Sequence, residues 1–328
     1  MGNARLLGRP ALTTLLAILL AAAPLHAGAQ AFPNRALRLV VPFGVGGNAD
    51  LVGRLVGQKL SEGLGQPVIV ENRLGAGGMI ANEFVAKSRP DGYTLLLLTG
   101  AFAIQTAMFN QLPYDAIKDF SMLSTVTIYP FVVVVRSETQ YKTLQDLVAY
   151  AKANPKKLNY GSSGIGSTHH LAVELFNGMA GTEIVHVPFR TATVNEILGG
   201  SVDVIFEVLS DALPHVKSGR LRALAVTSTN PLPLLPDLPP VAQTYPGYDV
   251  TTWLGLAAAA GTPPAIVERL NQEIRRVLAL PEIAQRFQDL SIPPQPSSPD
   301  QMRQYIEKEM AKWKQVVETR KIERITIK

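Results

Sequence analysis

The chain has 328 residues, a length that suits one large domain or two ordinary ones. Hydrophobic residues make up 47% of it and charged residues 17%, a globular composition that excludes an intrinsically disordered chain. The net charge is +5, but the basic residues are scattered and aromatic residues amount to only 7%, so a nucleic-acid binder is not expected. Cysteine is absent, which excludes disulfides, zinc–thiolate and iron–sulfur sites, and cysteine nucleophiles.

The N-terminus has the pattern of an export signal. Arg5 and Arg9 precede an uncharged apolar run from Ala11 to Ala23, and small residues follow at Ala27–Ala29. This predicts a secretory signal peptide over residues 1–29 and a periplasmic mature protein. The alternative of an uncleaved membrane anchor is disfavoured, because the run is too short to span about 30 Å of hydrocarbon.

After this signal, the chain alternates short buried strands with helices. Strands are predicted where apolar runs are bounded by turns, and helices where apolar residues recur three or four apart. The first predicted elements are a strand at Leu37–Phe43, a helix from Asn48 or Asp50 to Gly63, a strand at Val68–Val70, a helix after Gly75–Gly78 and a strand at Tyr93–Leu98. This β-α-β-α-β order is typical of a parallel sheet covered by helices.

The remainder of the chain repeats the pattern. Further strands are predicted at Phe131–Val135, Leu158–Tyr160, Ile184–Val187, Val202–Phe206, Leu221–Thr227 and Val250–Ala259. Helices are predicted to begin at Thr143, Ser167, Thr193, Pro263 and Pro299. Serine, threonine and proline favour helix N-termini, and Thr143–Asp146 and Thr193–Glu196 have the spacing of capping boxes.

The order of these elements predicts two α/β units that the chain connects twice, near residues 122–132 and 249–256. One domain would comprise residues 30–125 and 250–328, and the other residues 126–249. A chain that leaves one domain, builds a second and returns makes a hinge, and clefts between domains are preferred sites for small molecules. We therefore expect an α/β fold with a ligand cleft between two parallel-type sheets flanked by helices.

Three glycine-rich loops are predicted to join a strand to a helix, at residues 43–50, 75–78 and 161–168. In an open parallel sheet such loops gather at the carboxyl ends of the strands, where ligands bind. Helix N-termini present unpaired N–H groups and a partial positive charge, so the preferred guest is an anion. The first and third loops contain no Lys or Arg, which favours a carboxylate over a phosphate. Tight turns without a binding role are the simpler alternative for each loop.

Two enzyme motifs are approximated in these loops. Gly44–Ala49 fits the dinucleotide pattern G-x-G-x-x-A, but the signal peptide argues against a nucleotide and Asp50 would repel a pyrophosphate. Ser163 near His169 and His170 suggests a hydrolase, but the G-x-S-x-G pattern fails at its last position. Five histidines without an H-x-H or H-x-x-x-H pair do not predict a metal site, and we expect no cofactor.

Several charged residues have alternative roles. Arg190 follows Val187-Pro188-Phe189 at a strand end, where it is equally suited to a structural role and to pairing with a second carboxylate of the ligand. Asp203 and Glu207 alternate with strand residues, and each is suited either to brace a strand or to meet the ligand. Asp50 and Arg54 are four residues apart on one helix, so they are expected either to pair or to serve the first loop.

The assembled segments resemble the substrate-binding receptors of tripartite tricarboxylate transporters, also called Bug-type receptors. They run in order over nearly the whole mature chain, and their combination is far more specific than any one alone. The matching segments are Leu37–Asp50 (LRLVVPFGVGGNAD), Gly65–Gly78 (GQPVIVENRLGAGG), Pro90–Leu96, Leu112–Phe120, Tyr160–Leu171 (YGSSGIGSTHHL), His186–Phe189, Gly219–Thr227, Leu235–Leu238 and Gly261–Pro263. One departure is Arg190-Thr191, where the family commonly has Lys-Gly.

The resemblance implies a type II periplasmic-binding-protein fold that closes on a small carboxylate and delivers it to a membrane permease. It places the first-loop backbone and the opposing loop against the ligand. Together with the strand-end residues, the predicted ligand-binding set is Phe43, Gly44, Gly46, Gly47, Asp50, Gly77, Gly78, Thr99, Ser162, Ser163, Gly166, Ser167, Thr168, His170, Arg190 and Asp203.

We therefore expect a non-enzymatic, monomeric, exported receptor for a small mono- or dicarboxylate. Ligand binds the closed state better than the open one and so shifts the population toward closure. A receptor that feeds a membrane signalling sensor would use the same site, and an exported serine hydrolase is the remaining alternative. The ligand itself is not given by these patterns.

Overall fold

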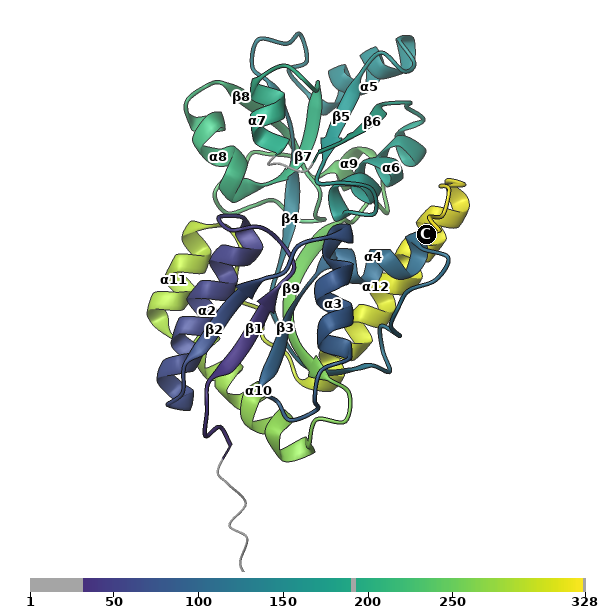
Figure 1. Ribbon diagram of the computed structural model, residues 1–328. Helices are drawn as coiled ribbons and strands as arrows, with labels where there is room; N and C mark the ends of the chain where they lie inside the picture. The colour runs from purple at the N-terminus through teal and green to yellow at the C-terminus, as the bar shows by residue number, and fades with distance from the viewer. Residues whose placement is uncertain (1–31, 190–192, 327–328) are drawn as a thin grey trace, which may run out of the picture. The chain divides into compact units, whose positions relative to one another are not determined.

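The computed structural model describes residues 32–189 and 193–326 (Figure 1). Its contacts divide the chain into a unit of residues 1–34 and a unit of residues 35–328, and the fold described below is that of the second unit. The predicted signal peptide lies outside the described residues, as does Arg190. Every helix in the described ranges is too short or too polar to cross a bilayer.

The first half of the sheet begins with three parallel strands in the order β2 (Val68–Asn72), β1 (Leu37–Val41) and β3 (Thr94–Thr99). The series continues through β9 (Thr251–Ala259), which runs antiparallel to β3, and β4 (Phe120–Arg136), which runs antiparallel to β9. The α/β fold is confirmed, but the sheet is mixed, because the two strands that connect its halves enter from opposite ends.

The long strand β4 belongs to both halves of the sheet. Its residues Phe120–Pro130 pair with β9, and Phe131–Val135 pair with β7 (Val204–Val208). The strand β8 (Leu221–Val226) also pairs with β4, while β5 (Asn159–Ser162) lies parallel between β7 and β6 (Val185–Pro188). The predicted crossings near residues 122–132 and 249–256 therefore form one antiparallel pair. The predicted domain boundaries stay a prediction, since residues 35–328 form one unit of contacts.

Only the second half of β4 was predicted from the sequence. The first half contains Ser124, Thr125 and Thr127, which break the apolar run and are nevertheless buried. The structure accommodates them because their hydroxyls donate to backbone carbonyls, Thr125 to Gln295 at 2.5 Å and Thr127 to Pro293 at 2.8 Å. Those partners lie about 170 residues away, so no local pattern predicts the strand.

Helices cover both faces of the first half-sheet (Figure 1). α2 (Asn48–Leu64) and α10 (Pro264–Leu278) contact each other on one face, and α3 (Met79–Ala86), α4 (Gly100–Met108) and α12 (Pro299–Thr319) lie on the other. α2 approaches closely because Gly53 faces the sheet, where a Cβ would lie 3.0 Å from Val41. The short η1 (Ala76–Gly78) precedes α3, and α11 (Pro281–Asp289) follows α10.

The second half-sheet carries α5 (Leu144–Ala153), α6 (Thr168–Ala180), α7 (Thr193–Leu198) and α8 (Leu209–Lys217), and α9 (Val241–Thr244) precedes β9. The capping box predicted at Thr143–Asp146 is confirmed, and Ser167 caps α6. The sequence did not predict α4, whose residues are buried nearly all round and so lack an amphipathic pattern.

Candidate functional site

The first glycine loop is held in shape by Asp50. Its carboxylate is 2% exposed and accepts hydrogen bonds from the Gly46 N–H at 3.0 Å, from Asn72 at 2.8 Å and from Arg54 at 3.0 Å. Asn72 also donates to the Phe43 carbonyl at 2.8 Å, which ties the loop to the end of β2. The pairing of Asp50 with Arg54 is confirmed.

These contacts decide the state of Asp50. Burial opposes its ionisation, but hydrogen bonds from Arg54, Gly46 and Asn72, together with the Arg54 charge, hold its pKa below the ordinary value. The carboxylate is thus charged, neutralised and engaged by the loop itself. Asp50 therefore shapes the loop and is not expected to contact the ligand. The Gly46 N–H donates to Asp50, so it is not free to bind a ligand.

The second glycine loop rests on a buried glutamine that sequence reasoning missed. Gln105 of α4 is 1% exposed and donates to the Gly77 carbonyl at 2.8 Å. Its own carbonyl oxygen accepts from Asn82 at 3.1 Å and from the Tyr114 hydroxyl at 2.7 Å. Gln105 lies in α4, which the sequence did not predict. Its role is visible only in the structure, where α4 lies next to the second glycine loop.

The first and second loops lie against each other. A Cβ at Gly78 would lie 3.0 Å from the Pro42 Cβ, and one at Gly44 would lie 3.6 Å from Leu74. The predicted glycines of the two loops, Gly44, Gly46 and Gly47 in the first and Gly77 and Gly78 in the second, therefore lie at the same end of the sheet. This is the carboxyl edge of β1 and β2, where the sequence places the site.

The third loop is built by its own polar side chains. Ser162 is fully buried, and its hydroxyl lies 2.6 Å from His186 Nε2 and donates to the Gly164 carbonyl at 3.1 Å. Ser167 accepts from the His170 N–H at 3.2 Å as the cap of α6, and the Gly166 N–H donates to His170 Nδ1 at 3.2 Å. These groups act mainly on the loop rather than outward.

Two stacked histidines lie beneath this loop. The ring centroids of His170 and His186 are 4.1 Å apart, and Tyr160 also stacks on His186, with centroids 4.9 Å apart. Burial lowers the pKa of His170 to about 3, with a smaller contribution from His186, and burial lowers the pKa of His186 to about 4. Both rings are therefore neutral near pH 7 and serve as uncharged hydrogen-bonding partners.

Ser163 is the exposed hydroxyl of the third loop, and its partner is His169. The Ser163 Oγ lies 3.1 Å from His169 Nδ1, while His169 Nε2 lies 3.4 Å from the Glu207 Oε1. Glu207 is 5% exposed and also accepts from the Val208 N–H at 2.9 Å and from the Thr193 hydroxyl. From the sequence, His170 was placed in the ligand set, His169 was considered only as a hydrolase partner of Ser163, and Glu207 was left between a bracing and a ligand-binding role.

Several contacts bring the third loop near the first half-sheet. A Cβ at Gly100, which follows Thr99 at the start of α4, would lie 2.7 Å from the Thr168 hydroxyl. Across the same region Asn48, at the start of α2, donates to the Tyr129 hydroxyl of β4 at 2.6 Å. Thr99, Thr168 and the first loop thus converge near the strand that joins the two halves.

Asp203 lies apart from these residues. It precedes β7, and its carboxylate accepts from the Asn159 N–H at the start of β5 at 2.9 Å. Because β5 and β7 are parallel, this is the opposite end of the strands from the Gly161–Thr168 loop. We therefore remove Asp203 from the candidate site. Its hydrogen bond to Asn159 is consistent with the alternative prediction that it braces a strand.

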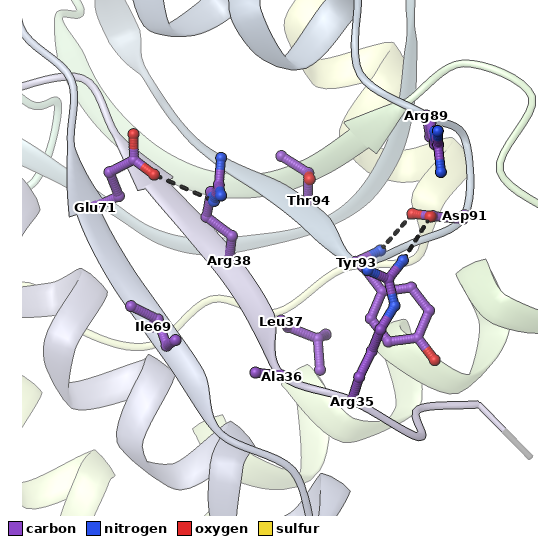
Figure 2. Close-up of a pocket in the computed structure, with 10 residues that line it drawn as sticks. All are labelled: Arg35, Ala36, Leu37, Arg38, Ile69, Glu71, Arg89, Asp91, Tyr93 and Thr94. Atoms are coloured by element: carbon purple, nitrogen blue, oxygen red, sulfur yellow. Dashed lines mark hydrogen bonds and ion pairs between the residues drawn. The ribbon is translucent and has the colours of Figure 1, made fainter.

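The structure also has a pocket of about 460 Å³ at the N-terminal ends of β1 and β3, shown in Figure 2. Its guanidinium groups are partly neutralised, since Arg35 pairs with Asp91 at 2.9 Å and Arg38 with Glu71 at 3.1 Å. The strands begin here, so this pocket lies at the end of the sheet opposite to the glycine loops. Within residues 32–189 and 193–326, no group of three or more His, Asp or Glu side chains is arranged to hold a metal.

Comparison with known proteins decides the family. The family model described as "Tripartite tricarboxylate transporter family receptor" matches residues 52–322. The chain belongs to this receptor family. Bordetella pertussis BugT is 34% identical over 93% of this chain and 96% of its own length. The resemblance seen in the sequence is confirmed.

Solved structures of family relatives confirm the fold. An R. palustris protein with adipate has a TM-score of 0.85 and 34% identity, and the match covers 90% of this chain and all of that one. MatC from Rhodopseudomonas palustris, with bound malate, has a TM-score of 0.81 and 32% identity, covering 87% of this receptor and all of MatC.

Proposed function

We propose that this receptor is a periplasmic protein that captures a small mono- or dicarboxylate without a chemical step and delivers it to the permease of a tripartite transporter. The observation that carries the proposal is that α2 and α4 begin at the carboxyl ends of the parallel strands β1 and β3, and that the start of α4 packs against Thr168 at the start of α6. The N-cap residues of α2 and α4, Gly47 and Thr99, make no side-chain cap hydrogen bond, which leaves first-turn N–H groups to an external acceptor.

The charge around the loops supports a carboxylate. Arg54 is committed to Asp50, so the first loop offers backbone N–H groups and no free cation of its own. A carboxylate is well held by N–H groups, hydroxyls and bridging water. The relatives solved with adipate and malate support the same chemical class for this receptor.

Delivery to the permease requires the receptor to close around its ligand, and the ligand must favour the closed arrangement. The connection between the half-sheets consists of β4 and β9, and we propose that they serve as the hinge. A ligand held by loops from both halves stabilises the closed arrangement by its differential affinity for it.

A thermal-shift screen of the protein lacking residues 1–29 tests this function. The panel contains adipate, malate and their diamides, which retain the carbon skeleton without the carboxylates. A ligand at about 100 times its Kd adds about 2.7 kcal/mol to the free energy of unfolding. A shift with an acid and none with its amide supports carboxylate capture, whereas equal responses to acid and amide, or none at all, contradict it.

A matched pair of variants locates the site in the first loop. Gly47 has a φ of −77°, and a Cβ there would lie 3.7 Å from the Gly44 carbonyl, so a side chain fits. Gly47→Asp places a negative charge at the α2 N-terminus, and we expect at least about a tenfold loss of acid affinity by calorimetry. Gly47→Asn has the same shape without the charge and is expected to lose much less. Equal losses in the two variants would place the ligand elsewhere.

A further inference from the structure

Exposed apolar side chains gather at the three glycine-rich loops. Within residues 32–189 and 193–326, seven large apolar side chains are exposed, and four of them lie in or beside these loops. They are Val45 in the first loop, Leu74 and Ile80 on either side of the second, and Ile165 in the third, and they are 47–76% exposed. We call these four residues the apolar rim. Single exposed apolar residues are common, but a group of them around one site marks a surface that another molecule covers.

Contacts place three members of the rim beside the open N-terminus of α2. Val45 lies two residues before Gly47, the N-cap residue that makes no side-chain cap hydrogen bond. Leu74 lies against the first loop, since a Cβ at Gly44 would be 3.6 Å from its Cδ2 atom. The Ile80 side chain occupies the space that a Cβ on the first glycine of the second loop would need. The apolar side chains therefore adjoin the backbone N–H groups that are free to hold a carboxylate.

The third loop reaches the same region through β4. The Tyr129 hydroxyl of β4 accepts a hydrogen bond from Asn48, at the start of α2, at 2.6 Å. Two residues further along the strand, the Phe131 ring stacks on His169 in the first turn of α6, with ring centroids 4.7 Å apart. The helices α2 and α6 thus begin beside neighbouring residues of one strand. Ile165 lies three residues before α6, so the third loop adds its apolar side chain to this site.

The charged side chains of the first two loops are engaged by other residues. The buried Asp50 pairs with Arg54 at 2.9 Å. Arg73, at the entrance of the second loop, pairs with Glu71 at 2.6 Å, and its guanidinium lies 3.7 Å from the centroid of the Phe84 ring. Within residues 43–50 and 73–78, every cation and anion therefore has a partner in the protein. A ligand carboxylate is left to the backbone N–H groups.

The hydroxyl groups of the third loop are engaged as well. Ser162 is fully buried, and Ser167 accepts from the His170 N–H as the cap of α6. The exposed Ser163 has its Oγ 3.1 Å from His169 Nδ1. The outward surface of the three loops is therefore made mainly of backbone N–H groups and the apolar rim. This combination suits a carboxylate that is attached to a hydrocarbon chain, and it offers few partners to a hydroxyl group on that chain.

We propose that the apolar rim covers the carbon skeleton of the ligand when the receptor closes, so that the receptor selects carboxylates with an unsubstituted hydrocarbon chain over hydroxy acids. This selectivity rests on the proposed function, whose substrate class it narrows. Closure removes apolar surface of both the rim and the chain from water, and each CH2 group that is buried raises the affinity about fourfold. A hydroxyl group on the chain loses its hydrogen bonds to water without gaining a partner in the protein.

Calorimetry with a series of acids measures this selectivity. Succinate, glutarate and adipate each differ from the next by one CH2 group, and malate is succinate with one added hydroxyl group. We expect the affinity to rise up to about fourfold with each added CH2 group. Malate should bind more weakly than succinate. Malate binding as tightly as succinate, or more tightly than adipate, would show that the rim does not select the chain.

Two pairs of matched variants assign the effect to the rim. Val45→Ala and Ile165→Ala shorten rim side chains and should each lower the adipate affinity about fourfold or more, with a smaller loss for malate. Val185→Ala and Ile69→Ala are the controls, because these side chains are 43% and 59% exposed at the opposite ends of their strands from the loops, Ile69 in the pocket of Figure 2. Both controls should bind both acids as the parent does. All four side chains are exposed, so the core stays intact.

The pattern of affinities separates this selectivity from the proposed function. Equal effects on adipate binding in the rim variants and in the controls overturn the selectivity alone. Unchanged adipate affinity together with reduced uptake by cells would assign the rim to the permease, which overturns it too. If Val45→Ala does not fold, Ile165→Ala decides the same question. Failure of every acid in the series to bind the unaltered protein overturns the proposed function and the selectivity with it.

Discussion

Buried polar residues in this receptor act first on the loops that they support. Asp50, Gln105 and His170 are each buried, and each forms a hydrogen bond with the backbone of a glycine-rich loop. The loops are short of side chains and gain their shape from these partners, so that the backbone N–H groups stay in fixed positions. Preorganisation of this kind reduces the ordering that a ligand must otherwise impose.

The buried histidine of the third loop makes stability depend on pH. The pKa of His170 is lowered from 6.5 to about 3, so the unfolded state takes up this proton first as pH falls. The stabilisation from the neutral ring is fully present above about pH 6.5 and is lost progressively toward pH 3. At about pH 5 this amounts to about 2 kcal/mol for one such group.

Urea unfolding at about pH 7.5 and pH 5 measures this loss. His170→Asn keeps an acceptor near the Nδ1 position for the Gly166 N–H but does not titrate. We expect the variant to be less stable at the higher pH and to lose about 2 kcal/mol less between the two conditions. An identical loss in both proteins would show that His170 is not the group that titrates.

At the level of whole elements, local patterns predicted most helices and strands. Predicted apolar runs coincide with the strands β1, β2, β3, β5, β6, β7, β8 and β9, and the Thr143 and Ser167 caps were predicted from adjacent residues. The helices α4, α8, α9 and α11 and the first half of β4 were not predicted. The first half of β4 and α4 are buried by segments far away in the sequence, which conceals the polar residues of β4 and removes the amphipathic pattern of α4.

The parts of the site that depend on local sequence were predicted, and the parts that depend on contacts between distant segments were not. The glycine loops follow from local turn chemistry, and the structure brings two of them into contact. The roles of Gln105, His169 and Glu207 depend on contacts between separate elements, and Asp203 was misplaced because one residue at a strand end does not show which end faces the loops.

We expect the close packing at the start of α4 to control the affinity of the site for its ligand. A Cβ at Gly100 would lie 2.7 Å from the hydroxyls of both Thr168 and Thr252. These are β-branched side chains with few rotamers, so Gly100→Ala forces α4 away from α6. We expect about 1–3 kcal/mol of destabilisation and a weaker affinity for the acid that the screen identifies.

Chemical unfolding and calorimetry of Gly100→Ala measure both effects. Gly178→Ala is the matched control, since its Cβ meets the flexible Arg320 side chain, which can move aside. We expect the control to bind with unchanged affinity. A Gly100→Ala variant as stable as the parent would show that the contact relaxes without moving α4.

On the scale of the whole molecule, the C-terminal segment reaches back to support the site. The Ile325 N–H donates to the Met108 carbonyl at 2.7 Å, the Asn110 N–H donates to the Ile325 carbonyl at 3.0 Å, and Arg324 donates to the Phe109 carbonyl at 2.7 Å. These bonds satisfy carbonyls at the end of α4. The third loop lies on the same residues, since a Cβ at Gly166 would lie 3.8 Å from Met108 and Phe109.

Removal of residues 323–328 tests this support without altering any predicted ligand contact. The deletion leaves the Met108 and Phe109 carbonyls without their protein donors, and we expect it to lower the free energy of unfolding by about 1–3 kcal/mol. Because α4 carries Gln105 as well as the surface under Gly166, the acid affinity should fall too, by a few-fold. Arg324→Ala, which removes one of these donors, should give a smaller change of the same sign. Unfolding curves and calorimetric titrations of the two variants decide the point: an affinity unchanged despite lower stability would mean that the loop keeps its shape without the end of α4.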